Sequence, residues 1–243
     1  MKILYGAIIV IVVLFIIVSI IGIFYLGPIV KVGIERFGPQ ITKVSVLVDS
    51  VSVSPLSGSA SVKGLVVGNP TGYSNPQAIN ITNATVSLDP YTLTSNKILI
   101  HSIHIDSPEI TYQIGLGGSN LNKILSNVNS SAQSPQASQN NTNNNGKPAS
   151  NIEIDDFLIT NAKVRVAISG VGGQLVPLPQ IHLTNLGKDN KGLSTVEITR
   201  VILTAVVTQT IKTVASSAGT IKNTVSTITS TLGNSLGNLL GNK

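Results

Sequence analysis

The chain has 243 residues, a net charge of +6 and no cysteine. The lack of cysteine excludes disulfides, thiolate metal ligands and cysteine nucleophiles, and the basic residues are scattered rather than gathered into a nucleic-acid-binding face. Charged residues make up 11% and aromatic residues 4% of the chain, which favours exposed β-sheet over a helical enzyme.

Residues 3–26 are apolar and contain no charged residue. As a helix with ~1.5 Å rise per residue, this stretch would extend roughly 36 Å, enough to cross a ~30 Å hydrocarbon core. We predict an uncleaved membrane anchor over residues 1–27, because the stretch is too long for a signal peptide and ends without a small-x-small cleavage site. The anchor positions are Ile3, Ile9, Val13, Ile17, Ile21 and Leu26.

The charges around the anchor bear on its orientation. Lys31, Arg36 and Lys43 outnumber Lys2, which by itself would place the large domain in the cytoplasm. Long domains, however, cross membranes largely regardless of charge. We therefore expect the amino terminus in the cytoplasm and residues 28–243 outside it.

Composition divides the rest of the chain into segments. The Asn/Ser-rich stretch before residue 150 has too few apolar residues to order itself, and two prolines near residue 178 favour an edge strand. We predict a juxtamembrane connector at 28–43, a β-rich lobe at 44–126, a disordered linker at 127–150, a second β segment at 151–193, a helix at 194–232 and a frayed tail at 233–243.

Two extended stretches, residues 97–114 and 151–168, resemble each other at an offset of 54 residues. Ile98 matches Ile152. In both copies apolar residues first recur at every second position, then step by three residues at the same place, between Ile100 and Ile103 in the first copy, and then recur at every second position again, which is a switch of parity. A bulge or bend in a long strand would produce that step. A chance match between two β-branched stretches is the alternative.

The carboxyl-terminal segment has helical periodicity. Ser194 or Thr195 together with Glu197 is typical of a helix start, and apolar residues recur every three or four positions from Ile211 to Leu232. The intervening Thr, Ser, Asn and Gly residues are poor helix formers, so the helix needs support. Packing on its own sheet, docking on another protein and lying on a bilayer all remain open.

No catalytic or metal site emerges from the sequence. His101 and His104 are three apart on a predicted strand, so they would face opposite sides unless a bend falls between them. Gly233-Asn234-Ser235-Leu236-Gly237 matches the nucleophile-elbow pattern but lies in a Ser/Gly/Asn-rich tail without the required preceding strand. We predict no enzyme activity, no cofactor and no nucleic-acid partner.

Several turn and strand motifs resemble those of the short AsmA-like proteins of Gram-negative envelopes. They span roughly residues 1–210 and comprise Gly64-Leu65-Val66-Val67-Gly68-Asn69-Pro70 with Gly72-Tyr73, Leu88-Asp89-Pro90, Ile105-x-x-Pro108-x-Ile110-x-Tyr112, Asn120-Leu121, and Leu178-Pro179-x-Ile181-x-Leu183. The resemblance implies a domain outside the inner membrane, built as a curved antiparallel sheet with an apolar concave face. Together with the anchor and the C-terminal segment, we expect a single-pass inner-membrane protein with a periplasmic domain: a mainly β fold with an N-terminal transmembrane helix and a C-terminal amphipathic helix. The resemblance offers no catalytic residues.

The first functional hypothesis is that the concave face binds or handles membrane lipid, such as a phospholipid, in cell-envelope biogenesis. The candidate groove residues are Ile98, Ile100, Ile103, Ile105, Ile152, Ile154, Phe157 and Ile159. The alternative is a structural or scaffold subunit of an envelope complex, with a protein partner on the C-terminal helix. Whether the groove is open or a closed core, and the identity of any lipid, stay open.

Overall fold

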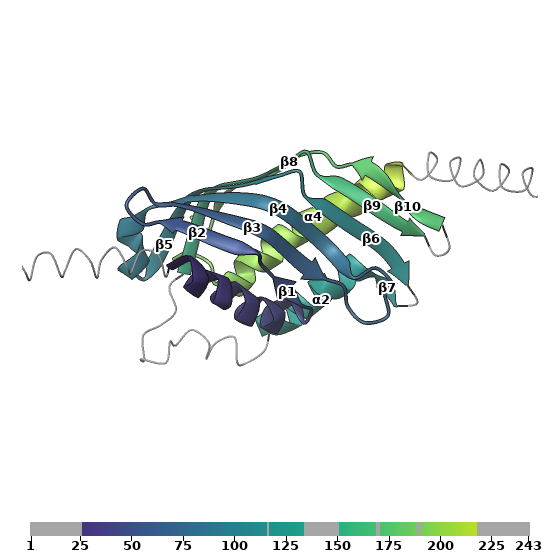
Figure 1. Ribbon diagram of the computed structural model, residues 1–243, viewed down its shortest axis with the longest axis horizontal. Coiled ribbons are helices and arrows are strands. Elements are labelled where there is room, and N and C mark those ends of the chain that lie inside the picture. Colours follow the sequence, from purple (N-terminus) through teal and green to yellow (C-terminus); the bar gives the residue numbers. More distant parts are fainter. Residues whose placement is uncertain (1–25, 116, 134–150, 169–170, 189–190, 218–243) are drawn as a thin grey trace, which may run out of the picture.

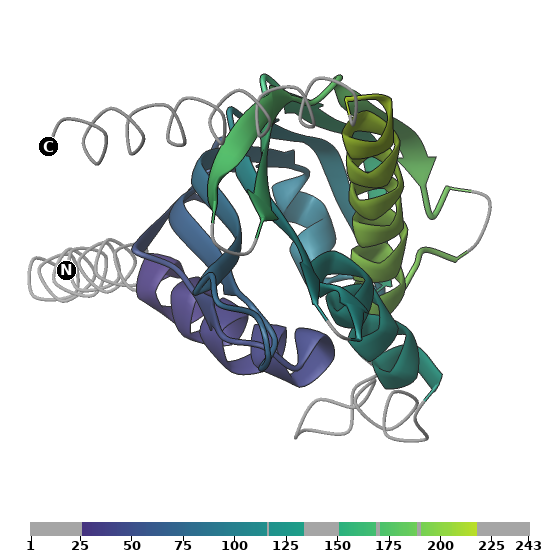
Figure 2. The same cartoon turned by 90° about the vertical axis from the view of Figure 1, so that its right-hand side faces the viewer.

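A computed structural model describes residues 26–115, 117–133, 151–168, 171–188 and 191–217. One curved mixed sheet forms the main layer, and two helices lie across its inner face (Figures 1 and 2). Of the predicted anchor over residues 1–27, the structure describes Leu26 and Gly27, which begin a helix over residues 26–42; the rest lies outside the described residues. The predicted mainly β fold is confirmed.

The named strands join end to end into six long strands across the sheet. Two short strands that follow each other in the chain pair with the same neighbour and so act as one long strand. β5 and β6 both pair with β4. Likewise β10 pairs with β9, and β11 pairs with β8, which precedes β9 in the chain. The spatial order is β1/β2, β3, β4, β5/β6, β8/β9 and β10/β11. The strands are β1 (Val46–Leu47), β2 (Ser50–Ser54), β3 (Ser59–Gly68), β4 (Gln77–Leu88), β5 (Lys97–Asp106), β6 (Glu109–Gly115), β7 (Gly118–Ser119, a hairpin on β6), β8 (Asn151–Thr160), β9 (Lys163–Ile168), β10 (Val171–Pro177) and β11 (Ile181–Leu186).

The two similar stretches are neighbours in the sheet, and they pair in parallel at the offset of 54 residues. Ile98 lies opposite Ile152, Ile105 opposite Ile159, and Ile110 opposite Val164. The expectation of a wholly antiparallel sheet is therefore wrong, because a parallel pair joins the copies. Parallel strands need a long crossover, and α2 (Asn120–Gln133) lies within that connection. It includes residues 127–133, which the sequence placed in the linker.

The predicted parity switch is a β-bulge. The register between β4 and β5 shifts because Ser87 pairs with Ser102 but Leu88 pairs with Ile100, which leaves His101 unpaired. The same position of the second copy is Asp155, opposite Asn185 of β11, which has a left-handed φ of 57°. The expected three-residue step is thus confirmed, and the irregularity crosses three strands.

A second irregularity, called here the crease, crosses the whole sheet. β1 gives way to β2 at residues 48–49, and β10 to β11 at residues 178–180. Between these edges, left-handed residues lie within β3 at Gly64 (φ 62°), between β5 and β6 at Ser107 (φ 54°), and between β8 and β9 at Asn161 (φ 54°). A left-handed residue turns the strand and changes which side chains face inward.

Helices α2 and α4 (Thr195–Ser216) close most of the inner face. Leu121, Ile124 and Val128 of α2 and Val206 and Val207 of α4 join one core cluster with the strands. Figure 2 shows the sheet bent around these helices. Among the described helices, α4 is long and apolar enough to span a membrane, but its core residues show that it packs on the sheet.

The start of α4 follows the predicted signal. Ser194 is the N-cap, its hydroxyl accepts from the Glu197 amide, and the Glu197 carboxylate accepts from the Ser194 amide. The hydrogen bonds that the Glu197 carboxylate accepts from the Ser194 amide and from the Ser194 hydroxyl lower the pKa of Glu197. The helix is described as far as Ser216, and its predicted continuation to residue 232 lies outside the described residues. Its buried positions include Thr210 and Thr213, while Ile211 and Val214 of the predicted apolar face are half-buried against the core. α4 is apolar on most sides rather than clearly amphipathic.

The helix over residues 26–42 covers the first edge of the sheet. Lys31 Nζ donates to the Asp49 carbonyl (3.1 Å), and Glu35 Oε1 accepts from the Val48 amide (3.0 Å). These two side chains thus form hydrogen bonds with backbone groups of residues 48 and 49, which lie between β1 and β2. The helix therefore protects an edge that would otherwise be open to pairing with another chain.

Candidate functional site

The eight predicted groove residues form four adjacent pairs on the inner face of β5 and β8. They divide by burial. Ile105, Ile154, Phe157 and Ile159 are at most 8% exposed and belong to the core cluster under α2 and α4. Ile98, Ile100, Ile103 and Ile152 are half-buried. The structure thus brings all eight together, but half of them line a closed core.

The half-buried members belong to a wider surface, called here the half-covered strip. One row of it crosses four strands, since Val53 pairs with Ala60, Ala60 with Val86, and Val86 with Ile103. The row ends at Phe157 of β8, which pairs with Ile103 and is 2% exposed. The side chains of the row are therefore more deeply buried toward β8. The strip comprises Val53, Ala60, Val86, Leu88, Ile98, Ile100, Ile103 and Ile152.

The helix over residues 26–42 adds an apolar surface near the strip. Its contact side is narrow, because a Cβ on Gly27 would lie 2.2 Å from the Val51 carbonyl oxygen and one on Gly38 would lie 2.8 Å from Val46 Cβ. Its other side exposes Ile29 (64%) and Phe37 (56%). The helix therefore joins the sheet through small residues and leaves large apolar residues free.

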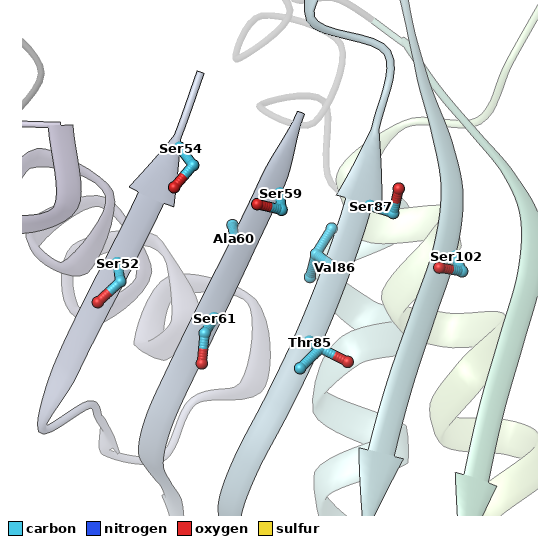
Figure 3. A pocket seen from close by; sticks show the side chains of 9 residues that line it. All are labelled: Ser52, Ser54, Ser59, Ala60, Ser61, Thr85, Val86, Ser87 and Ser102. Carbon is cyan, nitrogen blue, oxygen red and sulfur yellow. The ribbon is translucent and has the colours of Figure 1, made fainter. Parts of the chain in front are cut away.

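The outer face of the sheet is different in chemistry. Ser52 pairs with Ser61 and Ser61 with Thr85, while a second row joins Ser59, Ser87 and Ser102. These residues border a shallow depression of about 410 Å³ (Figure 3). It is lined by Ser52, Ser54, Ser59, Ala60, Ser61, Thr85, Val86, Ser87 and Ser102. The outer face of these strands is thus rich in hydroxyl groups, and Ala60 and Val86 of the strip also border the depression between them.

The histidines lie apart on the exposed surface. His101 Nδ1 lies 3.4 Å from Asp155 Oδ2, and His182 Nε2 lies 2.6 Å from Asp156 Oδ1. The bulge at His101 leaves both His101 and His104 exposed, unlike the opposite-face arrangement expected for an unbent strand. Among the described residues, no three His, Asp or Glu side chains gather as metal ligands.

The crease is held on its outer side by Asp106. Its carboxylate accepts hydrogen bonds from Asn161 Nδ2 (2.7 Å), Thr160 Oγ1 (2.9 Å) and Ser107 Oγ (2.9 Å). Asn161, followed by Thr160 and Ser107, lowers the pKa of Asp106. Two of its donors, Ser107 and Asn161, are the left-handed residues of the two copies, so one carboxylate fixes both bends.

Two of the motifs quoted from the sequence, the turn of Asn69 and Tyr73 and the dipeptide Asn120-Leu121, meet at one corner of the fold. Asn120, fully buried, donates to Asn69 Oδ1 (2.7 Å) and to the Thr111 carbonyl (2.8 Å), and accepts from the Gln113 amide (2.9 Å). Tyr73 donates to the Gly118 carbonyl at 3.0 Å. Segments far apart in sequence are thereby joined, which gives these motifs a structural rather than a chemical role.

Comparison with known protein families finds a match to the AsmA family, whose model covers residues 59–176, from the first residue of β3 into β10. The AsmA family is a family of membrane-associated envelope proteins. The match confirms the predicted resemblance. A search of curated proteins finds no match.

Proposed function

We propose that this protein is a non-enzymatic, single-pass inner-membrane protein whose periplasmic domain binds membrane lipid on the half-covered strip. The observation that carries the proposal is the row Val53–Ala60–Val86–Ile103, an apolar surface four strands wide and only half buried. Apolar surface of this kind favours contact with acyl chains over water.

The family match and the sequence support the location. The AsmA family is membrane-associated, and the uncharged residues 3–26 precede the helix that packs against β2. Under the proposal, residues 3–26 cross the membrane with the amino terminus in the cytoplasm. The strip then binds a phospholipid in envelope biogenesis, with the headgroup in water and the acyl chains on the sheet.

Site-specific photo-crosslinking tests the lipid site. A benzophenone-bearing amino acid is placed at Val86, on the inner face, or at Thr85, on the outer face next to it. After irradiation in native membranes, we expect a phospholipid-mass adduct at Val86 and none at Thr85. Equal labelling at both sites, or none at Val86, would reject the proposal.

Native mass spectrometry of the full chain from mild detergent provides a second readout. We expect a stoichiometric phospholipid that survives delipidating washes and is lost in Ile103→Asn. Ser102→Asn is the matched control, since Ser102 faces outward beside Ile103. Circular dichroism must show that both variants keep the fold.

A scaffold role is the second candidate, and the exposed side of the helix over residues 26–42 favours it. Val32 (60%) and Phe37 (56%) would bind an apolar partner surface. A complex that survives Ile103→Asn but is lost in Phe37→Ala would favour the scaffold over the lipid site.

A further inference from the structure

Three large apolar side chains are exposed at one end of the sheet. Leu56, in the turn between β2 and β3, is 93% exposed, and Tyr91 and Leu93 of the 3-10 helix η1 (Pro90–Thr94) are 90% and 46% exposed. Neither residues 52–58 nor residues 90–96 contain a charged side chain. This surface, called here the apolar tip, is defined by Leu56, Tyr91 and Leu93, and Asp89 and Lys97 border it in the sequence.

The two segments of the apolar tip are adjacent. The Leu88 amide donates to the Gly58 carbonyl at 2.7 Å, and a Cβ on Gly58 would lie 3.0 Å from Pro90 Cδ. The Asp89 side chain caps η1 by accepting from the Tyr91 amide at 2.9 Å. The tip is therefore a built surface whose segments are fixed to each other.

The chain enters the fold at the same end. Gly27 contacts the Val51 carbonyl, and β2 runs from there to Ser54 and the turn that carries Leu56. In Figure 1 the purple helix begins at the left end of the sheet, where the β2–β3 turn also lies. Ile29 and Val30 of its first turn are 64% and 41% exposed, which extends the apolar surface.

We infer that the apolar tip inserts into the interface of the bilayer that residues 3–26 cross. The inference rests on the proposed anchor, which would hold this end of the domain at the membrane. Exposed tyrosine and leucine suit the headgroup–acyl boundary, where an apolar ring is buried and its hydroxyl stays hydrated. The half-covered strip, through Val53 and Leu88, ends beside the tip, so lipid would reach the inner face directly from the bilayer surface.

The chain has no tryptophan, so a single introduced tryptophan reports on one site. The full chain is reconstituted into phosphatidylcholine–phosphatidylglycerol vesicles with or without brominated acyl chains. In Leu56→Trp and Tyr91→Trp we expect blue-shifted emission, about half of it quenched by the brominated lipid, as for side chains buried ~5–10 Å into the interface. Ile114→Trp is the matched control: Ile114 is 66% exposed near the β6–β7 turn, away from the tip.

The possible outcomes test insertion of the apolar tip separately from the membrane anchor and from the lipid site. Quenching at positions 56 and 91 but not at 114 supports insertion. Protein that floats with the vesicles while none of the three tryptophans is quenched overturns the inference and leaves the anchor standing. Equal quenching at all three sites also overturns it. Crosslinking of lipid at Val86 is independent of this result, so failure of the lipid site would be seen separately.

Discussion

At the residue scale, the crease is made by three left-handed positions that are stabilised in different ways. Ser107 and Asn161 are polar residues whose side chains donate to Asp106. Gly64 has no such side chain, and a Cβ there would lie 1.9 Å from Asp49 Oδ2. Local hydrogen bonds can offset a left-handed φ in the first two, whereas only glycine suits the third.

Gly64→Ala should therefore destabilise the protein by about 2 kcal/mol, because alanine is strained at φ 62° and collides with Asp49. Denaturant unfolding of the detergent-solubilised chain measures the change. Gly117→Ala is the control: no atom lies within 4 Å of its added Cβ, so we expect a change within about 0.5 kcal/mol. Equal effects of the two substitutions would contradict a special role for Gly64.

Asp106 should make stability depend on pH in the acid range. Its folded-state pKa lies below the ordinary value of 3.8, so the ionised carboxylate stabilises the fold. This stability is fully present above pH 3.8 and is lost as the pH falls through the lowered folded-state pKa. Asp106→Asn should be less stable than the wild type at pH 7, and the two unfolding curves should converge below pH 3.8.

Asn161→Gly provides the check on the cause. It keeps a residue that accepts a left-handed φ but removes the Nδ2 donor to Asp106. The pKa of Asp106, followed by NMR titration of its carboxyl carbon, should rise toward the ordinary value. An unchanged pKa would show that Asn161 is not its main cause.

At the scale of elements, the helix over residues 26–42 and the edge strand depend on close contact. Gly38→Val should push the helix away from the sheet, because a Cβ at position 38 would lie only 2.8 Å from Val46 Cβ. We expect faster hydrogen exchange at residues 46–51, above all at the Val48 amide that Glu35 holds. Gly33→Ala, with open space around it, should leave exchange unchanged and stabilise the helix by up to about 1 kcal/mol.

Much of the element pattern was predictable because local rules govern it. Alternating valines and serines predicted the strands from Val44 onward, and Ser194 with Glu197 predicted the start of α4. The three-residue step between Ile100 and Ile103 predicted a bulge, because the alternation of apolar and polar residues along one strand can be read from its sequence alone. The buried face of α4 was not predicted, since Thr210 and Thr213 face the core for reasons of tertiary packing.

At the scale of the whole molecule, α4 is part of the core. Truncation after Thr208 would remove Thr210 and Thr213, which are 0% and 7% exposed. We expect this chain to unfold at a clearly lower temperature than a chain truncated after Ser217, which keeps the whole of α4. Equal melting temperatures, measured by circular dichroism, would show that the last two turns of α4 do not stabilise the sheet.

The arrangement of the sheet was less accessible from sequence than its strands. The offset of 54 residues relates Ile98 to Ile152, but similarity alone does not state that two copies are neighbours, or in which direction they pair. The structure places the candidate groove residues in adjacent pairs on β5 and β8. Ile154 is buried whereas Ile98 is only half-buried, because α2 and α4 cover one part of this face and not the other. The position of these helices on the sheet depends on tertiary packing, which the sequence pattern does not show.

The parallel pairing of the two copies has a consequence for how the protein is made. When residues 46–115 have emerged and the second copy has not, β5/β6 is an unpaired edge whose proper partner resembles itself. A second copy from a neighbouring chain would match that edge in the same register. At high protein concentration, two molecules can therefore exchange these strands during folding. Slow synthesis of residues 151–168 would lengthen the time during which the edge of β5/β6 is unpaired and exchange can occur.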